Sequence, residues 1–124
     1  MNLSRQAHLR TSADFRRVYS QGRRYDGRLM TVFLLPNGLP HHRFGITASR
    51  KAIGNAVERN RSKRLLREAF RLSGAALEGL QGKYDWVLNA RRSLLYVKVF
   101  APLEEFERIA ARAALDERAR IAEK

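Results

Sequence analysis

The sequence has 124 residues, no cysteine and a formal net charge of +13 at pH 7. This length allows one modest hydrophobic core, so we expect a single domain over residues 1–124. The lack of cysteine excludes disulfides and thiolate metal sites, and it is typical of a protein of the reducing cytoplasm.

Residues 1–10 are polar and basic with little periodicity, and we expect them to form an irregular basic arm. No apolar segment follows Arg5 and Arg10, so the start of the chain does not resemble a signal peptide. The longest mostly apolar stretch, residues 94–103, is too short to span a bilayer and contains Lys98. We therefore expect a soluble, cytoplasmic protein that does not bind a membrane.

A short helix is predicted over residues 13–21. Thr11 or Ser12 can cap its start, and Gly22 ends it. Three apolar side chains share one face at helical spacing: Phe15, Val18 and Tyr19. On pattern alone, the ordinary expectation for such a face is that it packs into the core.

Residues 22–27 suggest a basic turn, and residues 28–35 suggest a strand that is apolar on both faces. The turn sequence Pro-Asn-Gly at 36–38 predicts that this strand forms an antiparallel hairpin with residues 43–49. The adjacent pair His41 and His42 has no carboxylate cluster nearby in the sequence, so we expect exposed histidines and no metal site.

The helix predicted over residues 56–73 is the main feature of the chain. Asn55 and Glu58 form a capping-box-like pair at its start, and Gly74 is the first plausible stop. Polar side chains share one face: Asn60, Lys63, Arg64, Arg67 and Arg71. Apolar side chains lie roughly opposite: Leu65, Leu66, Ala69 and Leu72.

The cations of this helix indicate an anionic partner. Arg59 and Arg61 lie in its first turns, where the helix dipole disfavours positive charge. Five of the six basic residues between positions 59 and 71 are arginine, whose planar fork suits phosphate, and Glu68 is the one acid among them. The alternative interpretation is a merely solvated helix face.

After this helix, residues 74–82 are rich in glycine and alanine and predict a connection, and residues 83–90 predict a strand. Strand, long helix and strand together make a β-α-β unit. We expect residues 93–100 to form a loop, and a last helix to follow near Pro102 and to fray over residues 116–124. Its predicted apolar stripe comprises Leu103, Phe106, Ala110, Ala113 and Ala114.

The charge is uneven along the chain. Residues 1–71 hold 16 Lys and Arg against 4 Asp and Glu, whereas residues 72–124 hold 9 against 8. A basic binding face therefore belongs to the first part of the chain, and nucleic acid is the polyanion that it suits best. The basic helix contains no Trp, which disfavours a membrane surface as the partner.

The string G-N-A-V-E-R-N-R-S-K-R-L-L-R-E-A-F-R at residues 54–71 resembles the signature of the bacterial ribonuclease P protein family. Further similarity lies in A-D-F-R-R-V-Y-S-Q-G at 13–22, R-F-G-I-T-A-S-R-K at 43–51 and W-V-L-N-A-R-R at 86–92, so it covers roughly residues 9–110. The resemblance implies an α+β fold, a two-layer α/β sandwich with a small, mostly antiparallel sheet. It further implies a left-handed β-α-β crossover through the basic helix, as in domain 2 of ribosomal protein S5. At residues 93–100 the family usually has smaller, loop-like residues.

The resemblance also implies a function: an RNA-binding subunit that assists a catalytic RNA in removing the 5′ leader of precursor tRNA. The partners would be the ribonuclease P RNA and precursor tRNA, not DNA. Mg²⁺ would bind through RNA phosphates, with no catalytic residue in the protein. The residues expected to bind the RNA are Arg50, Lys51, Asn55, Arg59, Asn60, Arg61, Lys63, Arg64, Arg67 and Arg71. Those expected to line a cleft for the leader are Phe15, Arg16, Tyr19 and Phe33.

Two other functions remain open from the residues alone. A ribosomal-type structural RNA-binding protein would share the charge and fold class without a role in cleavage. A self-sufficient nuclease would need clustered carboxylates or paired histidines near a phosphate site. The acids of residues 1–71 are instead scattered along the chain: Asp14, Asp26, Glu58 and Glu68.

Overall fold

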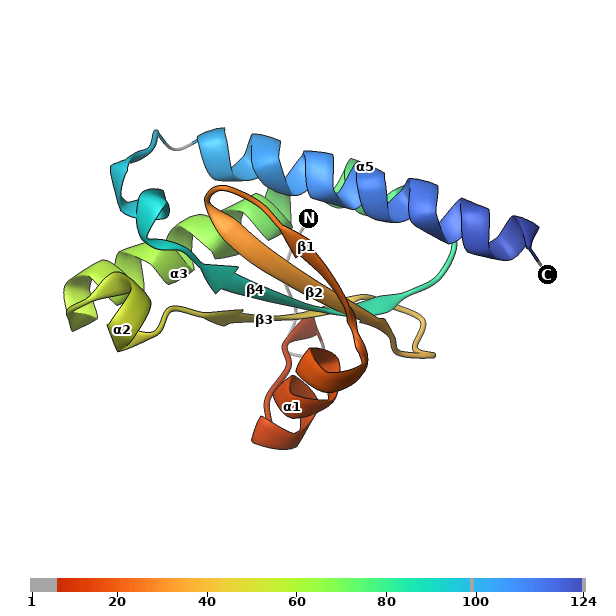
Figure 1. The fold of residues 1–124 in the computed structure, drawn as a ribbon, viewed down its shortest axis with the longest axis horizontal. Coiled ribbons are helices and arrows are strands. Elements are labelled where there is room, and N and C mark those ends of the chain that lie inside the picture. The colour runs from red at the N-terminus through yellow and green to blue at the C-terminus, as the bar shows by residue number, and fades with distance from the viewer. Residues whose placement is uncertain (1–6, 99, 124) are drawn as a thin grey trace.

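The computed structural model describes residues 7–98 and 100–123 of the chain. A four-stranded sheet in the order β1-β2-β4-β3 lies in its middle (Figure 1). The elements in chain order are α1 (Ser12–Gln21), β1 (Arg23–Asp26), β2 (Met30–Pro36), β3 (Arg43–Thr47), α2 (Arg50–Ile53), α3 (Ala56–Leu72), α4 (Gly74–Glu78), β4 (Tyr84–Ala90), the 3₁₀ helix η2 (Arg92–Tyr96) and α5 (Phe100–Ala122).

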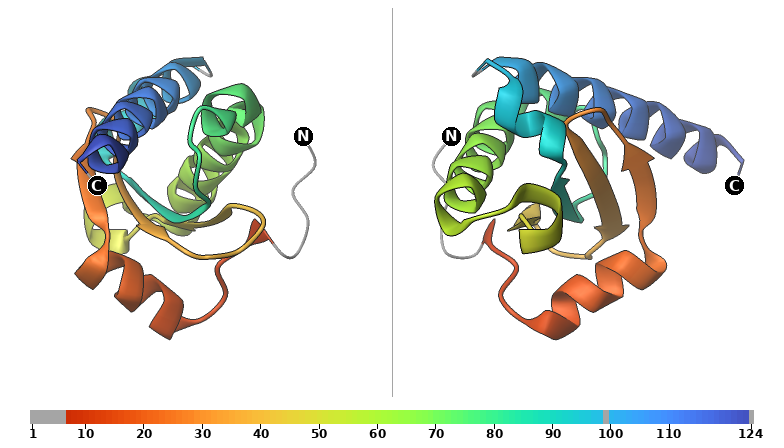
Figure 2. Two further views of the ribbon diagram at one scale, coloured as in Figure 1. Left: turned by 90° about the vertical axis from the view of Figure 1, so that its right-hand side faces the viewer. Right: turned by 60° about the vertical axis from the view of Figure 1, so that its left-hand side comes forward.

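The helices lie on both faces of this sheet. Helices α3 and α5 cover one face, and α1 crosses part of the other (Figures 1 and 2). The main core fills the space beneath α3 and α5, where Phe70, Trp86 and Phe106 are fully buried. The fold class predicted from the sequence, an α+β sandwich with a small, mostly antiparallel sheet, is confirmed.

The predicted hairpin between residues 28–35 and 43–49 is wrong. Strand β4 lies between β2 and β3, pairing antiparallel with β2 and parallel with β3. All residues of β4 except Asn89 are buried, as expected for a strand that lies between two others in the sheet. The parallel pair β3 and β4, joined through α3, confirms the predicted β-α-β unit.

Two predicted connections contain secondary structure. Residues 22–27, expected as a basic turn, contain the edge strand β1, which pairs antiparallel with β2. Tyr25 is the one buried residue of β1, and the other three are exposed and charged. The strand therefore shows almost no apolar alternation in the sequence. Residues 74–82 contain the short helix α4, on which Leu77 is buried.

Helix α3 begins as the capping signal predicts and ends one residue before the predicted end. Asn55 Oδ1 accepts a hydrogen bond from the backbone amide of Glu58 at 2.9 Å. The buried stripe, however, is phased differently from the prediction, because Phe70 is fully buried and Leu72 is 49% exposed. The centre of the stripe comprises Ser62, Leu66, Ala69 and Phe70.

The C-terminal part of α5 is ordered, and the prediction of a frayed end from residue 116 is wrong as far as Ala122. Glu117 is buried and accepts hydrogen bonds from the amides of Gln81 and Gly82 and from the Tyr84 hydroxyl. This carboxylate joins the α4–β4 connection to α5. The apolar pattern of the sequence does not reveal such a contact, because its central residue is charged.

The predicted basic arm is only partly described, since residues 1–6 lie outside the described residues. Beyond them, His8 forms a parallel bridge with Phe44, and the Leu9 amide donates to the Phe44 carbonyl at 2.8 Å. Leu9 is buried, so residues 7–10 are attached to the edge of β3.

The segment expected as a loop, residues 93–100, contains most of η2 and the first residue of α5. It forms no strand among its described residues, in agreement with the expectation. Among the helices of the described residues, none is both long and apolar enough to cross a membrane.

Candidate nucleic-acid interface

The basic face of α3 is open to solvent along much of its length. Asn60, Arg64 and Arg67 are exposed, and Lys63 and Arg71 are half-buried. Arg71 forms an ion pair with Glu68 at 2.7 Å, whereas Lys63, Arg64 and Arg67 form no ion pair among the described residues. The structure therefore leaves three cations of this face available to an anion.

Arg59 and Arg61, also predicted to bind RNA, have different surroundings. Arg61 Nη1 donates to the backbone carbonyl of Leu95 at 3.1 Å, so this side chain lies towards η2. Arg59 is half-buried, and its Nε has no hydrogen-bond partner within the described part of the chain. Arg61 is therefore turned towards η2, whereas Arg59 lies one helical turn before Lys63 on the same side of α3.

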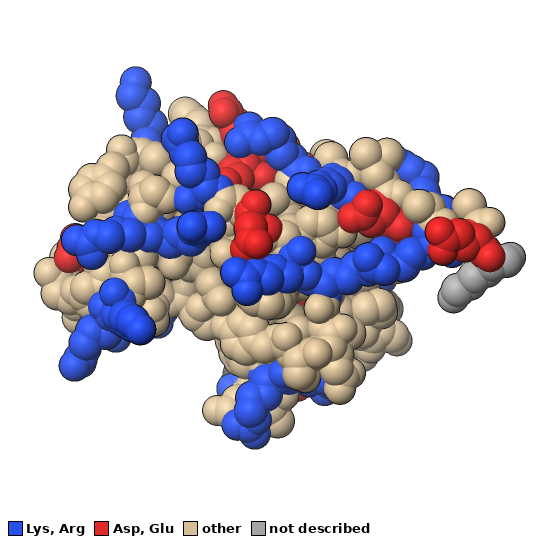
Figure 3. Space-filling model, viewed as in Figure 1, with Lys and Arg blue, Asp and Glu red and all other residues tan. Residues whose placement is uncertain are grey.

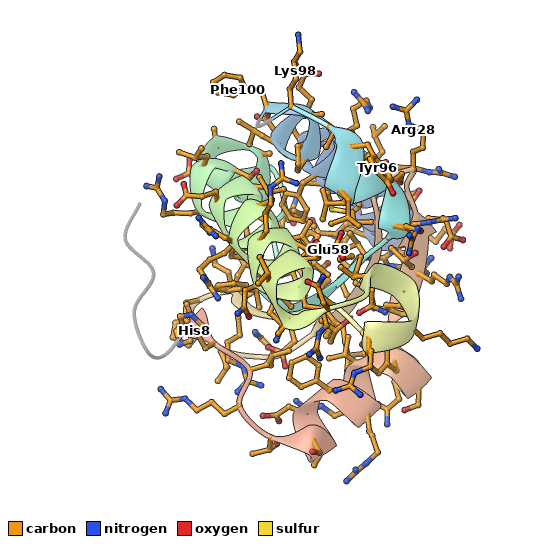
Figure 4. The ribbon with its side chains drawn as sticks, turned by 90° about the vertical axis from the view of Figure 1, so that its left-hand side faces the viewer. His8, Arg28, Glu58, Tyr96, Lys98 and Phe100 are labelled. Atoms are coloured by element: carbon orange, nitrogen blue, oxygen red, sulfur yellow. The ribbon has the colours of Figure 1, made fainter. Side chains whose placement is uncertain are left out.

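Arg50 and Lys51 lie on the short helix α2, which Ser49 caps by accepting from the Ala52 amide at 3.1 Å. Both cations are exposed. Helix α2 and the 3₁₀ helix η2 lie beside the N-terminal end of α3, where Glu58 is found (Figure 4). The two cations therefore continue the positive charge beyond the start of α3.

The aromatic residues predicted to line a leader cleft meet on the opposite face of the sheet. The rings of Tyr19 and Phe33 contact each other edge to face, with centroids 4.9 Å apart. Phe15 is half-buried over Gly45, where a Cβ atom would lie 2.4 Å from the Phe15 ring. Tyr19 is 38% exposed, and Arg16 is exposed on the same helix.

The structure adds polar residues to this face that the sequence prediction missed. Tyr19 Oη donates to Asn89 Oδ1 at 2.8 Å, and Thr47 Oγ1 donates to the same oxygen at 2.5 Å. The guanidinium of Arg24 lies over the Phe33 ring, 5.6 Å from its centroid. Along β4, Asn89 points to the opposite face from the buried Trp86 and Leu88. This period of two in the sequence could have placed Asn89 on the face that carries α1.

A buried carboxylate anchors the end of this face near α1. Asp85 is 1% exposed and accepts hydrogen bonds from Arg43, Asn37 and Arg17. Burial alone would raise the pKa of Asp85, but the donors outweigh it and hold this pKa below its ordinary value. Asp85 is therefore ionised at neutral pH and serves to position α1 against the sheet.

The histidine pair is not an exposed pair, contrary to the prediction. His42 is half-buried, and its Nδ1 accepts from the Tyr84 amide and from Trp86 Nε1, both at 3.1 Å. Burial and the charge of Lys83 lower the pKa of His42, so the neutral ring is favoured. The described residues contain no group of three or more His, Cys, Asp or Glu side chains that could hold a metal ion.

The fold and these two surfaces define a small basic α+β protein with one arginine-rich helix and one aromatic surface at Tyr19 and Phe33. The chain matches the family model described as Ribonuclease P over residues 3–114, and it therefore belongs to the family of bacterial ribonuclease P protein components. It is 38% identical over 109 residues to the ribonuclease P protein component of Caldanaerobacter subterraneus subsp. tengcongensis, covering 88% of this chain and 90% of that protein.

Solved structures agree with this assignment. The ribonuclease P protein of Staphylococcus aureus superposes with a TM-score of 0.73 at 29% identity, covering 86% of this chain and 94% of that one. The protein of Thermotoga maritima also gives a TM-score of 0.73, at 28% identity, covering 85% of this chain and 96% of that one. The family predicted from the residue 54–71 signature is confirmed.

Proposed function

We propose that this chain is the RNA-binding protein subunit of ribonuclease P and assists a catalytic RNA in removing the 5′ leader from precursor tRNA. The observation that carries the proposal is the pair of surfaces on opposite faces of one sheet. Cations that form no ion pair among the described residues lie on α3, and the contacting rings of Tyr19 and Phe33 lie on the side of the sheet that carries α1. One surface suits a phosphate backbone, and the other suits unpaired bases.

The row on α3 is assigned to the ribonuclease P RNA. Asn60 and the cations Lys63, Arg64 and Arg67 lie along one side of the helix, and Arg50 and Lys51 extend it. Arginine forks can bind phosphate oxygens in pairs, and such contacts are insensitive to base sequence. Asn55 contributes by capping α3, since its Oδ1 is occupied by the Glu58 amide.

The leader of precursor tRNA is assigned to the surface around Tyr19 and Phe33, which we call the aromatic cleft because we propose that the leader lies in it. Tyr19 presents a partly exposed ring against Phe33, and the guanidinium of Arg24 over the Phe33 ring adds a cation. Stacking on such rings tolerates every base, which suits leaders of different sequence. Phe15 supports the cleft from beneath by packing over Gly45, and the exposed Arg16 lies on the same helix.

Catalysis is assigned to the RNA subunit, with Mg²⁺ bound through RNA phosphates. Such ions would stabilise the attacking and leaving oxygens of the cleaved phosphodiester. The contribution of this chain is to bind, to orient the leader and to neutralise phosphate charge. A cytoplasmic location is part of the same proposal.

A cleavage assay at low Mg²⁺ tests this function. It compares three samples acting on a precursor tRNA: the protein alone, the ribonuclease P RNA of the same genome alone, and the mixture of the two. We expect cleavage by the mixture to be much faster than by the RNA alone, and none by the protein alone. Binding of the RNA without any effect on cleavage would favour a ribosomal-type structural protein. Cleavage by the protein alone would overturn the division of labour.

A further inference from the structure

A second arginine-lined surface lies between β1 and α5, away from the two surfaces described above. Two adjoining hollows of about 300 and 400 Å³ share Tyr25, Asp26 and Arg112 in their linings. Five exposed arginines line one or both hollows: Arg23, Arg24, Arg28, Arg108 and Arg112. We call these two hollows together the β1–α5 groove.

The arginines of this groove come from distant parts of the sequence. Arg23 lies on the edge strand β1, Arg28 lies in the turn that leads to β2, and Arg108 and Arg112 lie on α5. The groove therefore has a cationic wall on each side. Figure 3 shows this face, with Lys and Arg side chains along α5 and below it and acidic side chains among them.

The carboxylates of the groove are already engaged by other groups of the chain. Asp116 accepts from the Tyr25 hydroxyl at 2.5 Å, and Asp26 pairs with Arg24 at 2.9 Å. The buried Glu105 accepts from the amides of Arg28 and Leu29. Apart from the pair of Asp26 with Arg24, no ion pair joins these carboxylates to the other four arginines of the groove, in the part of the chain that the structure describes.

The groove is also held in a fixed shape. Burial and the bond to Asp116 raise the pKa of Tyr25 to about 12, so the phenol stays protonated and joins β1 to α5. Arg112 lies over the Tyr25 ring, with its guanidinium carbon 5.9 Å from the centroid. Glu105 fixes the turn that carries Arg28, whose side chain points away from the body of the molecule (Figure 4).

We propose that the β1–α5 groove is a second RNA-binding site, which binds the sugar-phosphate backbone without regard to base sequence. The inference rests on the proposed function, because it assumes that the polyanion of this protein is RNA. All four unpaired cations are arginines, which bind phosphate oxygens bidentately. Strand β1 is an edge of the sheet, so outward backbone amides can add further contacts.

Single substitutions on α5 test the groove. Arg108→Ala and Arg112→Ala remove groove cations, and Arg118→Ala is the matched control, because Arg118 is exposed on the same helix and lines neither hollow. Binding of the full-length variants is measured over a range of salt, separately to ribonuclease P RNA and to precursor tRNA. A thermal melt of each variant establishes that it is folded.

We expect each groove variant to bind one of the two RNAs about threefold to tenfold more weakly than the parent, and the control to bind normally. The dependence of log K on log salt should flatten by about 0.7–0.9 for each lost phosphate contact. The RNA that shows the loss identifies which partner occupies the groove. Groove variants that match Arg118→Ala with both RNAs would overturn the inference and leave the proposed function intact. A parent protein that binds neither RNA would overturn both.

The position of the RNA can be tested independently of affinity. The chain has no cysteine, so Ala119→Cys introduces a single attachment point for a hydroxyl-radical reagent, two helical turns beyond Arg112 on α5. We expect radical cleavage of a short RNA segment from this position. The exposed Ala75→Cys on α4, which lines neither hollow, serves as the control. The same cleavage pattern from both positions would contradict a strand in the groove.

Discussion

Arg43 and Asp85 face each other in the register of the parallel strands β3 and β4, and two hydrogen bonds join them. Arg43 Nε donates to Asp85 Oδ1 at 2.8 Å, and Nη2 donates to Oδ2 at 2.7 Å. Arg17 of α1 also donates to Asp85 Oδ2, at 3.2 Å. This carboxylate therefore links the helix of the aromatic cleft to the two strands that flank the β-α-β crossover.

The first prediction concerns this link. Asp85→Asn should lower the free energy of unfolding by about 2–3 kcal/mol at neutral pH, because Arg43 loses its charged partner. This expected loss is smaller than the roughly 3–5 kcal/mol lost when a fully buried ion pair is broken, because the Arg43 side chain is 22% exposed. Urea unfolding of both proteins measures it. Asp26→Asn is the control, because its pair with Arg24 is exposed and should contribute little.

The same pair predicts a pH dependence. The pKa of Asp85 is lower in the folded protein than the ordinary value of about 3.9, so its contribution is complete above that value. The contribution is lost as the pH falls through the folded pKa, because the parent then also carries a neutral side chain. The stability difference between parent and Asp85→Asn should therefore shrink in acid. A difference that stays constant from neutral pH into the acid range would contradict the assignment.

The second prediction tests the phase of α3. Leu66 is fully buried, so Leu66→Ala should cost about 2–5 kcal/mol through lost burial and a residual cavity. Leu72 is 49% exposed, and Leu72→Ala should cost less than about 1 kcal/mol. Thermal or urea unfolding compares the two variants, which remove the same atoms from one helix. Equal losses would mean that the helix is turned differently on the sheet.

The sequence predicted those features that depend on neighbouring residues. The start of α3 at Ala56 follows from the Asn55 cap, and the end of α1 follows from Gly22, because both signals are local in the chain. The cations of α3 were assigned to one face for the same reason, since a helix has a fixed period. The family signature added the fold class, which the comparisons confirm.

The features that the sequence did not predict depend on contacts between distant residues. The Pro-Asn-Gly turn favours a hairpin of β2 with β3, but no local signal reveals that β4 enters between them. The cleft contact between Tyr19 and Asn89 and the groove formed by Arg23 and Arg112 likewise require the fold. In the sequence, Glu117 does not differ from the polar residues of a frayed helix end, because its partners on the α4–β4 connection lie about 35 residues away.

The third prediction concerns the row of cations on α3. Arg64→Ala and Arg67→Ala should weaken binding to the ribonuclease P RNA without loss of fold, because both side chains are exposed and neither forms an ion pair among the described residues. Each lost phosphate contact should flatten the slope of log K against log salt by about 0.7–0.9. Salt titrations of the two variants and of Arg118→Ala measure it. Unchanged slopes would support a merely solvated helix face.

The last prediction separates leader binding from core packing at Tyr19. This side chain is 38% exposed and stands against Phe33, so Tyr19→Ala removes a stacking surface and little buried volume. The affinity of the assembled enzyme for precursor tRNA should fall by up to about 1–3 kcal/mol, whereas its affinity for mature tRNA, which has no leader, should not change. Tyr19→Phe keeps the ring and should retain most of the affinity, losing only the bond to Asn89. Phe15→Ala should instead lower the melting temperature, because Phe15 packs over Gly45. Affinity measurements for both tRNA forms, together with a thermal melt of each variant, distinguish the two roles. Equal losses of affinity for the two tRNA forms in Tyr19→Ala would rule out the leader cleft.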